Sequence, residues 1–248
     1  MTFKAKALSL VRRGKREVIL TAIGFNGGNN LFKWQLAYSR TLDKGLISKV
    51  LYFPNQDAWL EMFPGLRKLS ITAEQMRFTD RRATYMGAAQ DTDYTPQERA
   101  RFIKDVLLTS DGFKQSLERA QAFVRDDDLV INVRRGDYYN SRFEPEFGIN
   151  IVEYVRQALA KQLALGPVGR VVLVSDNVPW CVDNLTHLAP QLEFVVNENR
   201  RDMFDDLAVL ACAKRLILAN STFSYWGAFI AQVLGTQLEN IVAPAFHQ

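Results

Sequence analysis

Residues 129–138 read LVINVRRGDY, an apolar run that ends in two arginines and a Gly-Asp pair. The run predicts a strand that is covered on both faces, as in a parallel sheet. Alternation along the strand puts Asn132 and Arg134 on one face and Arg135 on the other. Since an unpaired guanidinium is costly to bury, we expect Arg134 to meet a phosphate and Arg135 to pair with a carboxylate such as Asp137. Structural ion pairs at both arginines are the equally weighted alternative.

The rest of the chain alternates strand-like and helix-like segments, which predicts an α/β fold with largely parallel sheets. The expected strands are residues 18–25, 49–53, 129–133, 170–175, 192–196, 216–219 and 240–242. The expected helices are residues 30–43, 96–108, 112–124, 149–165, 178–187, 201–214 and 223–234. The segment 54–128 is expected to be mostly helical, and its last three aspartates are interpreted as a solvated linker rather than a metal site. Ligands of such sheets bind beyond the carboxyl ends of the strands.

Three other segments place polar residues between a strand and a helix. The segment NSTFS at 220–224 begins the last helix, and its hydroxyls exceed what one helix cap needs, which favours phosphate binding. Ser175 and Asp176 end another strand, where contact with a nucleoside and capping of the next helix are equally weighted. The turn FNGGNN at 25–30 permits close approach of the backbone to a ligand, which by itself is a weak signal.

The charge of the chain is compatible with three classes of binding partner. The net charge of +4 and the pI near 9.1 suit an anionic small molecule, a membrane surface or a nucleic acid. A nucleic acid is disfavoured because the basic residues do not alternate with aromatic ones, as a stacking surface requires.

The two cysteines, Cys181 and Cys212, and the two histidines are too few for a disulfide framework, a zinc site or a histidine-centred triad. Both thiols are therefore expected in the core.

The beginning of the chain is basic, with Lys4, Lys6, Arg12, Arg13, Lys15 and Arg16 among its first residues. A solvated terminus is favoured over peripheral contact with anionic lipids at the inner face of a membrane. No apolar run approaches the roughly 20 residues of a membrane-spanning helix, and no signal-peptide pattern opens the sequence. The expected location is therefore the cytoplasm.

The segment VRRGDY at 133–138 resembles the HxRRGDY signature of the α-1,2-fucosyltransferases. Residues 206–214, followed by 219–228, resemble the second signature of that family, an acidic helix that runs into ANSSFSWWGA. Weaker similarity covers three further blocks, at residues 28–32, 174–180 and 241–244. The two signatures match in register over more than twenty positions, which makes the resemblance specific, and the blocks occur in the order of the family.

The resemblance implies a GT-B-like α/β fold with two Rossmann-like halves, an acceptor-side domain at 1–126 and a GDP-fucose-binding domain at 127–248. It implies an inverting transfer of L-fucose from GDP-fucose to a galactoside O2 of a glycan acceptor, with no metal or cofactor. Arg134 would neutralise the β-phosphate as GDP departs, and Asp137 or Glu144 would be the general base. The other residues implied at the donor are Gly28, Asn29, Asn132, Arg135, Ser175, Asp176, Asp206, Asn220, Ser221 and Thr222.

This sequence departs from the family pattern at several positions. Asn132 replaces a histidine, Asn30 a glutamine and Tyr225 a tryptophan, while Phe25 and Asn26 replace two glycines. The departures leave two alternatives open. One is an α-1,6- or peptide O-fucosyltransferase, a class that also carries arginines at this strand end. The other is a nucleotide-sugar-binding protein without turnover.

Overall fold

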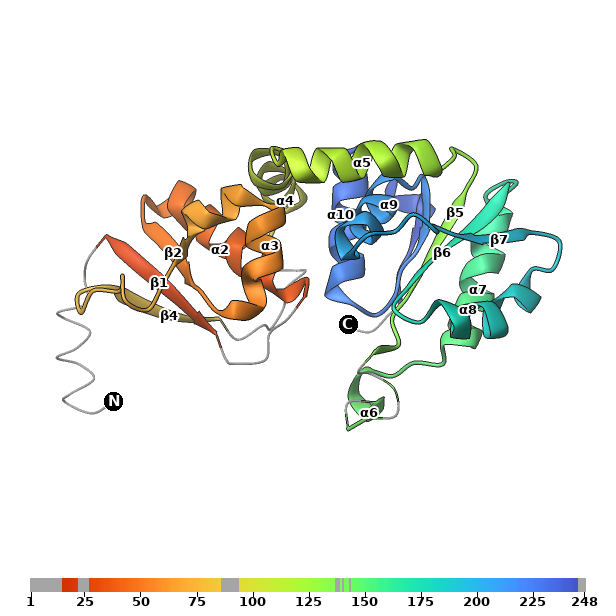
Figure 1. Ribbon diagram of the computed structural model, residues 1–248, viewed down its shortest axis with the longest axis horizontal. Helices are drawn as coiled ribbons and strands as arrows, with labels where there is room; N and C mark the ends of the chain where they lie inside the picture. Colours follow the sequence, from red (N-terminus) through yellow and green to blue (C-terminus); the bar gives the residue numbers. More distant parts are fainter. Residues whose placement is uncertain are drawn as a thin grey trace. The chain divides into compact units, whose positions relative to one another are not determined.

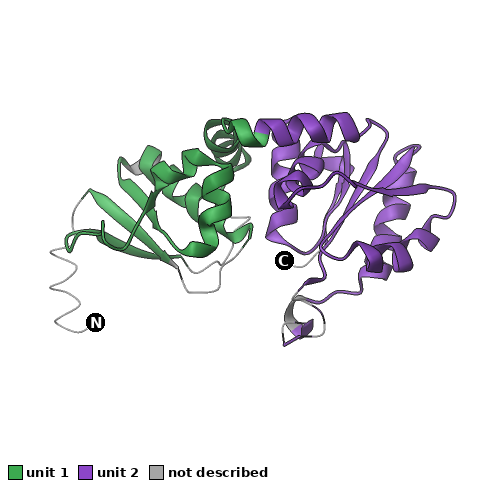
Figure 2. Ribbon diagram, viewed as in Figure 1, with its two compact units in different colours: residues 1–113 green, residues 114–248 purple. Residues whose placement is uncertain are grey.

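The computed structural model describes residues 15–21, 27–85, 94–136, 139, 141–142 and 144–244. The chain divides into two compact units, residues 1–113 and 114–248, which Figure 2 shows in green and purple. No helix in the described part of the chain is both long enough and apolar enough to cross a bilayer.

The second unit is built on a five-stranded parallel sheet (Figure 1). Its strands are β5 (Leu129–Val133), β6 (Arg170–Ser175), β7 (Glu193–Val196), β8 (Arg215–Ile217) and β9 (Ile241–Val242), in the spatial order β7-β6-β5-β8-β9. Its main helices are α7 (Ile151–Ala164), α8 (Val178–Leu185), α9 (Met203–Cys212) and α10 (Thr222–Val233). The helix α6 (Glu144–Phe147) and the 3₁₀ turns Thr186–Leu188 and Leu238–Asn240 are short. Every strand and main helix expected after residue 128 is therefore present.

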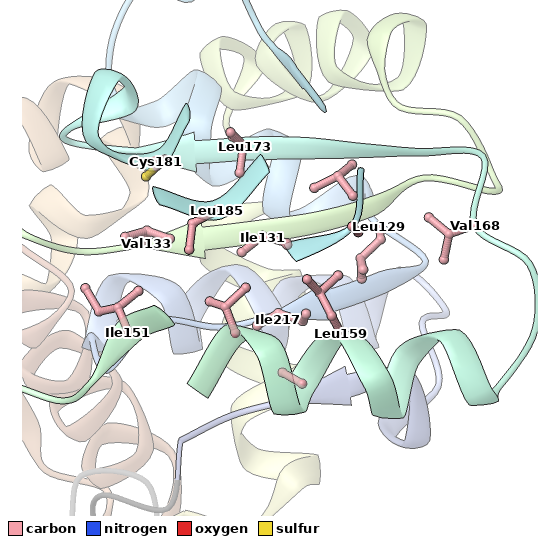
Figure 3. Close-up of a cluster of buried hydrophobic side chains, with 14 residues drawn as sticks. Leu129, Ile131, Val133, Ile151, Leu159, Val168, Leu173, Cys181, Leu185 and Ile217 are labelled. Carbon is pink, nitrogen blue, oxygen red and sulfur yellow. The ribbon is translucent and has the colours of Figure 1, made fainter. Parts of the chain in front are cut away.

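Both faces of this sheet are covered, as the apolar runs predict. Figure 1 shows α7 and α8 on one face and α9 and α10 on the other. On the first face, Ile131 of β5 packs in one cluster with Leu159 of α7 and Leu185 of α8 (Figure 3). Cys181 is fully buried in that cluster, as expected, whereas Cys212 is only partly buried. On the second face, α10 approaches α9 so closely that a Cβ on Gly227 would lie 2.5 Å from Leu210 Cβ.

The first unit contains a four-stranded parallel sheet with the order β3-β2-β1-β4. Its strands are β1 (Arg16–Thr21), β2 (Ile47–Leu51), β3 (Ser70–Ile71) and β4 (Arg81–Tyr85). Its helices are α2 (Asn29–Lys44), α3 (Asp57–Met62) and α4 (Pro96–Phe102), with 3₁₀ turns at Pro54–Gln56 and Pro64–Leu69. A π turn at Ile103–Leu107 follows α4, and α5 (Asp111–Phe123) runs from this unit into the next.

The prediction of a mostly helical middle segment missed β3 and β4. Strand β3 has only two residues, too few for any periodicity to show. Strand β4 reads RRATY and has four partly or fully exposed residues before its buried tyrosine, so no apolar run marks it. Both strands lie at the edges of their sheet, where pairing on one side is enough.

The aspartate run 126–128 is not simply a solvated linker. Asp126 and Asp127 are exposed, but Asp128 is fully buried. Its carboxylate accepts hydrogen bonds from Arg170 Nε at 2.8 Å, from Arg170 Nη2 at 3.0 Å and from the Arg125 N–H at 2.8 Å. The contact with Asp128 raises the pKa of Arg170. Asp128 thus joins the starts of two neighbouring strands, a partnership that spacing along the chain could not indicate.

Replacing Asp128 by Asn should destabilise the protein, because it leaves Arg170 buried without its counter-charge. Breaking a buried ion pair by removing one partner costs about 3–5 kcal/mol. Urea unfolding of the variant measures the loss. The matched control is Asp126→Asn, an exposed change in the same run, which should stay within about 0.5 kcal/mol of the wild type. Equal stability of the two variants would contradict a structural role for the Asp128–Arg170 pair.

Candidate functional site

The order of strands in the second unit reverses between β5 and β8. From β5 the chain continues outward through β6 and β7, whereas from β8 it continues to β9 on the opposite side. The loops after β5 and β8 therefore leave in opposite directions at the carboxyl edge of the sheet. This switch point is where open α/β sheets bind their ligands.

A pocket lies at this switch point, with about 290 Å³ of empty space that is partly open to solvent. Asn132 and Arg134 line it from the end of β5, and Asn220 lines it from the segment after β8. The other lining residues are Val133, Tyr139, Ile149, Ile151, Tyr154, Val155 and Ala219. The structure thus brings together three polar residues that the sequence predicted from two distant segments.

Arg134 is held at the mouth of β5 by Asp176, which follows β6. Arg134 Nη1 lies 2.8 Å from Asp176 Oδ2, and the Arg134 side chain is 40% exposed. The other carboxylate oxygen of Asp176 accepts a hydrogen bond from the Arg135 N–H at 2.9 Å. One carboxylate therefore fixes both the turn after β5 and the direction of Arg134, whose side chain stays partly exposed.

Gly136 is required for this arrangement. Its φ is +26°, and a Cβ there would lie 2.6 Å from Asp176 Oδ2 and 2.8 Å from Arg134 Cζ. A side chain at this position would push the ion pair apart. The glycine of the RRGD segment therefore allows the backbone to pass directly over the Arg134–Asp176 pair.

Arg135 lies against aromatic rings. Its Cζ is 4.1 Å from the centre of the Trp180 ring and 4.7 Å from the centre of the Tyr139 ring, two cation–π contacts. The carboxylate expected beside it, Asp137, lies outside the described residues, so that pairing and the role of Asp137 as base stay predictions. No sequence signal beyond the presence of aromatic residues could have indicated this pair of rings.

Asn132 and Ser175 are tied to the backbone around them. The Asn132 amide donates to the Val174 carbonyl of β6 at 2.9 Å. The Ser175 hydroxyl accepts from the Asn177 N–H at 3.0 Å, and Asn177 in turn caps α8 by accepting from the Trp180 N–H at 3.2 Å. Asn177, and not Asp176, therefore caps α8. Asp176 pairs with Arg134 instead.

The segment after β8 begins α10 without using all of its hydroxyls as caps. Ser221 is the N-cap residue, but its side chain makes no capping hydrogen bond. Ser224 is fully buried, and its hydroxyl accepts from the Ala219 N–H at 3.0 Å. Ser221 and Thr222 are partly exposed beside the buried Asn220. The start of this helix thus offers two hydroxyls near the switch point, a suitable surface for an anion.

Asp206 is not among the residues that line this pocket, and the glycine turn belongs to the other unit. Asp206, on α9, is bound by Arg200 through two contacts of 2.8 Å, and burial raises its pKa while the hydrogen bond from Arg200 opposes the rise. Gly28 and Asn29 lie in the first unit, at the start of α2. Phe25 and Asn26 lie outside the described residues. No group of three or more His, Cys, Asp or Glu side chains that could hold a metal ion occurs in the part of the chain that the structure describes.

The sequence did not indicate the aromatic side of the pocket. Tyr154, on α7, donates from its hydroxyl to the Leu218 carbonyl at 2.8 Å, and burial raises its pKa well above the usual value. The hydroxyl of Tyr139 donates to the Ile149 carbonyl at 2.9 Å. A tyrosine on the apolar face of a helix is a weak signal, because most such residues only fill a core.

Taken together, a doubly wound parallel sheet and a switch-point pocket with an accessible arginine define a Rossmann-type ligand-binding unit. Comparison with known proteins then gives the family. The sequence model of Glycosyl transferase family 11 matches residues 94–247. This chain belongs to glycosyl transferase family 11, and its resemblance to the α-1,2-fucosyltransferases is confirmed.

Individual relatives are distant. The O-antigen biosynthesis glycosyltransferase WbnK of Escherichia coli is 27% identical over 101 residues, 40% of this chain and 33% of that protein. The galactoside alpha-(1,2)-fucosyltransferase 2 of Oryctolagus cuniculus is 27% identical over 139 residues, 51% of this chain and 39% of that protein. The chain thus spans between a third and two-fifths of the length of these relatives.

A solved structure supports the fold. The crystal structure of POFUT1 in complex with GDP-fucose matches with a TM-score of 0.52 and 10% identity, over 92% of this chain and 97% of that chain. The expected fold class is confirmed: an α/β protein with two parallel sheets, of the GT-B-like type.

Replacing Asp176 by Asn removes the charge that faces Arg134 but keeps an oxygen for the Arg135 N–H. Because both side chains of the ion pair are partly exposed, the free energy of unfolding should fall by less than about 1 kcal/mol. Urea unfolding beside Asp128→Asn makes the comparison direct. A loss at Asp176 as large as the loss at Asp128 would assign this pair to the fold rather than to the site.

Proposed function

We propose that this protein transfers L-fucose from GDP-fucose to a hydroxyl of a glycan acceptor, with O2 of a galactoside as the expected position. The transfer is inverting and needs no metal ion. The observation that carries the proposal is Arg134, an arginine that pairs with Asp176 at the switch point, lines the pocket there and has a side chain that is 40% exposed. Membership of glycosyl transferase family 11 supports the same chemistry.

In this proposal the departing diphosphate is stabilised by groups that are already in place. Arg134 donates to the β-phosphate and neutralises the charge that develops as the glycosidic bond breaks. Ser221, Thr222 and the free N–H groups at the start of α10 bind the same anion. These hydrogen-bonding groups are already in position before GDP-fucose binds. The protein therefore needs no reorganisation during the transfer. A fixed cation here supplies what a divalent metal would otherwise supply.

The remaining predicted residues surround the nucleoside or complete the site. Asn132, Asn220, Ser175 and Asp176 lie along the carboxyl edge of the sheet, where a nucleoside would extend from the diphosphate. Arg135 and Asp206 brace that edge, through Trp180 and Arg200 respectively. Gly28 and Asn29 would contribute from the first unit. The general base is Asp137 or Glu144. In this assignment the donor domain begins near residue 127, and the residues before it bind the acceptor.

The proposed location is the cytoplasm. Peripheral contact with the anionic inner face of a membrane is a further part of this proposal. Such contact would depend on the basic residues at the beginning of the chain, of which those up to Arg13 lie outside the described residues. Arg16 is not available for lipid headgroups, since its guanidinium pairs with Asp80 at 2.6 Å. The proposed membrane contact therefore depends on the residues before it.

The decisive measurement is GDP release from GDP-fucose in the presence of EDTA and a panel of β-galactosides. We expect release that depends on a galactoside and that falls by about 100-fold or more in Arg134→Ala, as when one stabilising donor is removed from a transition state. Arg156→Ala is the matched control, because Arg156 is an exposed arginine of the same unit. Equal losses in both variants would contradict the role of Arg134.

Calorimetry with GDP separates the alternatives if nothing turns over. GDP binding that is lost in Arg134→Ala, without any transfer, would favour a nucleotide-sugar-binding protein. Transfer to a peptide or to a 6-hydroxyl instead of a galactoside O2 would favour another fucosyltransferase type. Absence of GDP binding by the wild type would overturn the donor site.

A further inference from the structure

Lys33 is a buried cation that has no counter-charge among the residues that the structure describes. It lies on α2 in the first unit with 1% of its surface exposed, between Phe32 and Trp34, which are fully buried. Within the described residues no carboxylate or carbonyl pairs with its amine. Burial lowers the pKa of Lys33 to about 8. Lysine is rarely buried unless it is paired, so its position here calls for an explanation.

The neighbouring polar residues on α2 also lack partners. Asn30 is fully buried, and neither atom of its side-chain amide makes a hydrogen bond. The side-chain oxygen of Asn29 is likewise buried without a partner. A buried polar group without a hydrogen bond costs about 1–3 kcal/mol, so native proteins seldom retain several of them together without a ligand or water to satisfy them.

These groups lie within the first five residues of α2. Residues three apart on a helix are neighbours on its surface, so Asn30 and Lys33 share one face. Because long side chains on a helix lean back toward its N-terminus, we expect the Lys33 stem to run toward Asn30 and Asn29. The turn therefore gathers an ammonium group, an amide and an amide oxygen. Together they offer donors for an anionic group and an acceptor for a hydroxyl beside it.

The charge of the first unit points to the same kind of ligand. Residues 1–113 carry 18 lysines and arginines against 11 aspartates and glutamates, whereas residues 114–248 carry 13 against 16. The net charges are therefore +7 and −3. The second unit already has Arg134 for the donor diphosphate. An excess of positive charge on the other unit favours a second anionic ligand, because it raises the local concentration of anions.

We propose that Asn30 and Lys33 form a subsite for an anionic group of the glycan acceptor, a carboxylate or a phosphate carried by a sugar. That the bound anion belongs to a glycan acceptor rests on the function proposed above. The existence of an anion subsite does not depend on that function. Lys33 donates to the anionic oxygens together with the Asn30 amide, whereas Asn29 keeps the donor role proposed above. A neutral sugar would leave the Lys33 amine without its partner.

Binding of three matched probes tests the subsite. They are methyl β-galactoside, its 6-phosphate, and methyl β-galacturonide, which carries a carboxylate at C6. Ligand-observed NMR titration of the wild type should show at least one acidic probe bound about tenfold more tightly than the neutral one, and the preferred probe tells phosphate from carboxylate. The preference should vanish in Lys33→Met and persist in Lys68→Met, an exposed lysine of the same unit. Equal affinities for all three probes, or equal losses in both variants, would overturn the subsite.

GDP titrated into the same samples keeps the two proposals apart. GDP binding that is equal in the wild type and in Lys33→Met, beside a lost preference for the acidic probe, supports an acceptor subsite. If Lys33→Met weakens GDP instead of the acidic probes, the anion held is the diphosphate and the acceptor assignment is overturned. If the wild type binds an acidic probe but not GDP, the donor site fails while the anion subsite stands.

Thermal unfolding without ligand gives an independent readout. Methionine matches the length of the lysine stem and removes a buried charge without a partner, so Lys33→Met should raise the Tm by a few degrees. Lys68→Met should leave the Tm unchanged. A higher Tm together with lost acid recognition is the signature of a group kept for binding. An unchanged or lower Tm would mean that the amine is satisfied within the protein, which would overturn the inference.

Discussion

Strand β5 is hydrogen-bonded on both sides, to β6 along its full length and to β8 along its first residues. Because all three strands are parallel, their carboxyl ends meet at one edge of the sheet. This single constraint places Val133 opposite Ser175 on one side and brings the segment after β8 to the end of β5 on the other side. The turns that carry Arg134, Asp176 and Asn220 lie far apart in the sequence. The pairing of the strands is what brings them to the same edge of the sheet.

The two ends of this sheet use the same chemistry for different purposes. At the amino end, Asp128 and Arg170 form a buried pair, which is costly to break because neither charge has water to replace its partner. At the carboxyl end, Arg134 and Asp176 form a partly exposed pair of the same distance, which contributes little to stability. Only the second pair can exchange its partner for a ligand without unfolding the sheet. Exposure, rather than the residue types, separates the structural pair from the pair that we propose to bind the ligand.

The sequence predicted those parts of the fold that leave a local signal along the chain. The bounds of β5 and β6 were predicted residue by residue, because an apolar run is a local signal that burial on both faces produces directly. Strands β3 and β4 were missed because edge strands need no such run. The ligand was expected beyond the carboxyl ends of the strands, but the pairing of Arg134 with Asp176 depends on register between strands, which no local pattern records. The burial of Asp128 and the aromatic contacts of Arg135 were missed for the same reason.

Asn132 shows how a departure from the family pattern is accommodated. Its amide is engaged by the Val174 carbonyl of the neighbouring strand, so the side chain is fixed and cannot swing toward a ligand as a freely placed donor. Its side-chain oxygen remains as an acceptor at the pocket wall. Tyr139 and Tyr154, which line the same pocket, supply ring surface that asparagine lacks. In the proposed donor site, ring contact with the nucleotide would thus come from these tyrosines, while position 132 would read a hydrogen-bond donor on it.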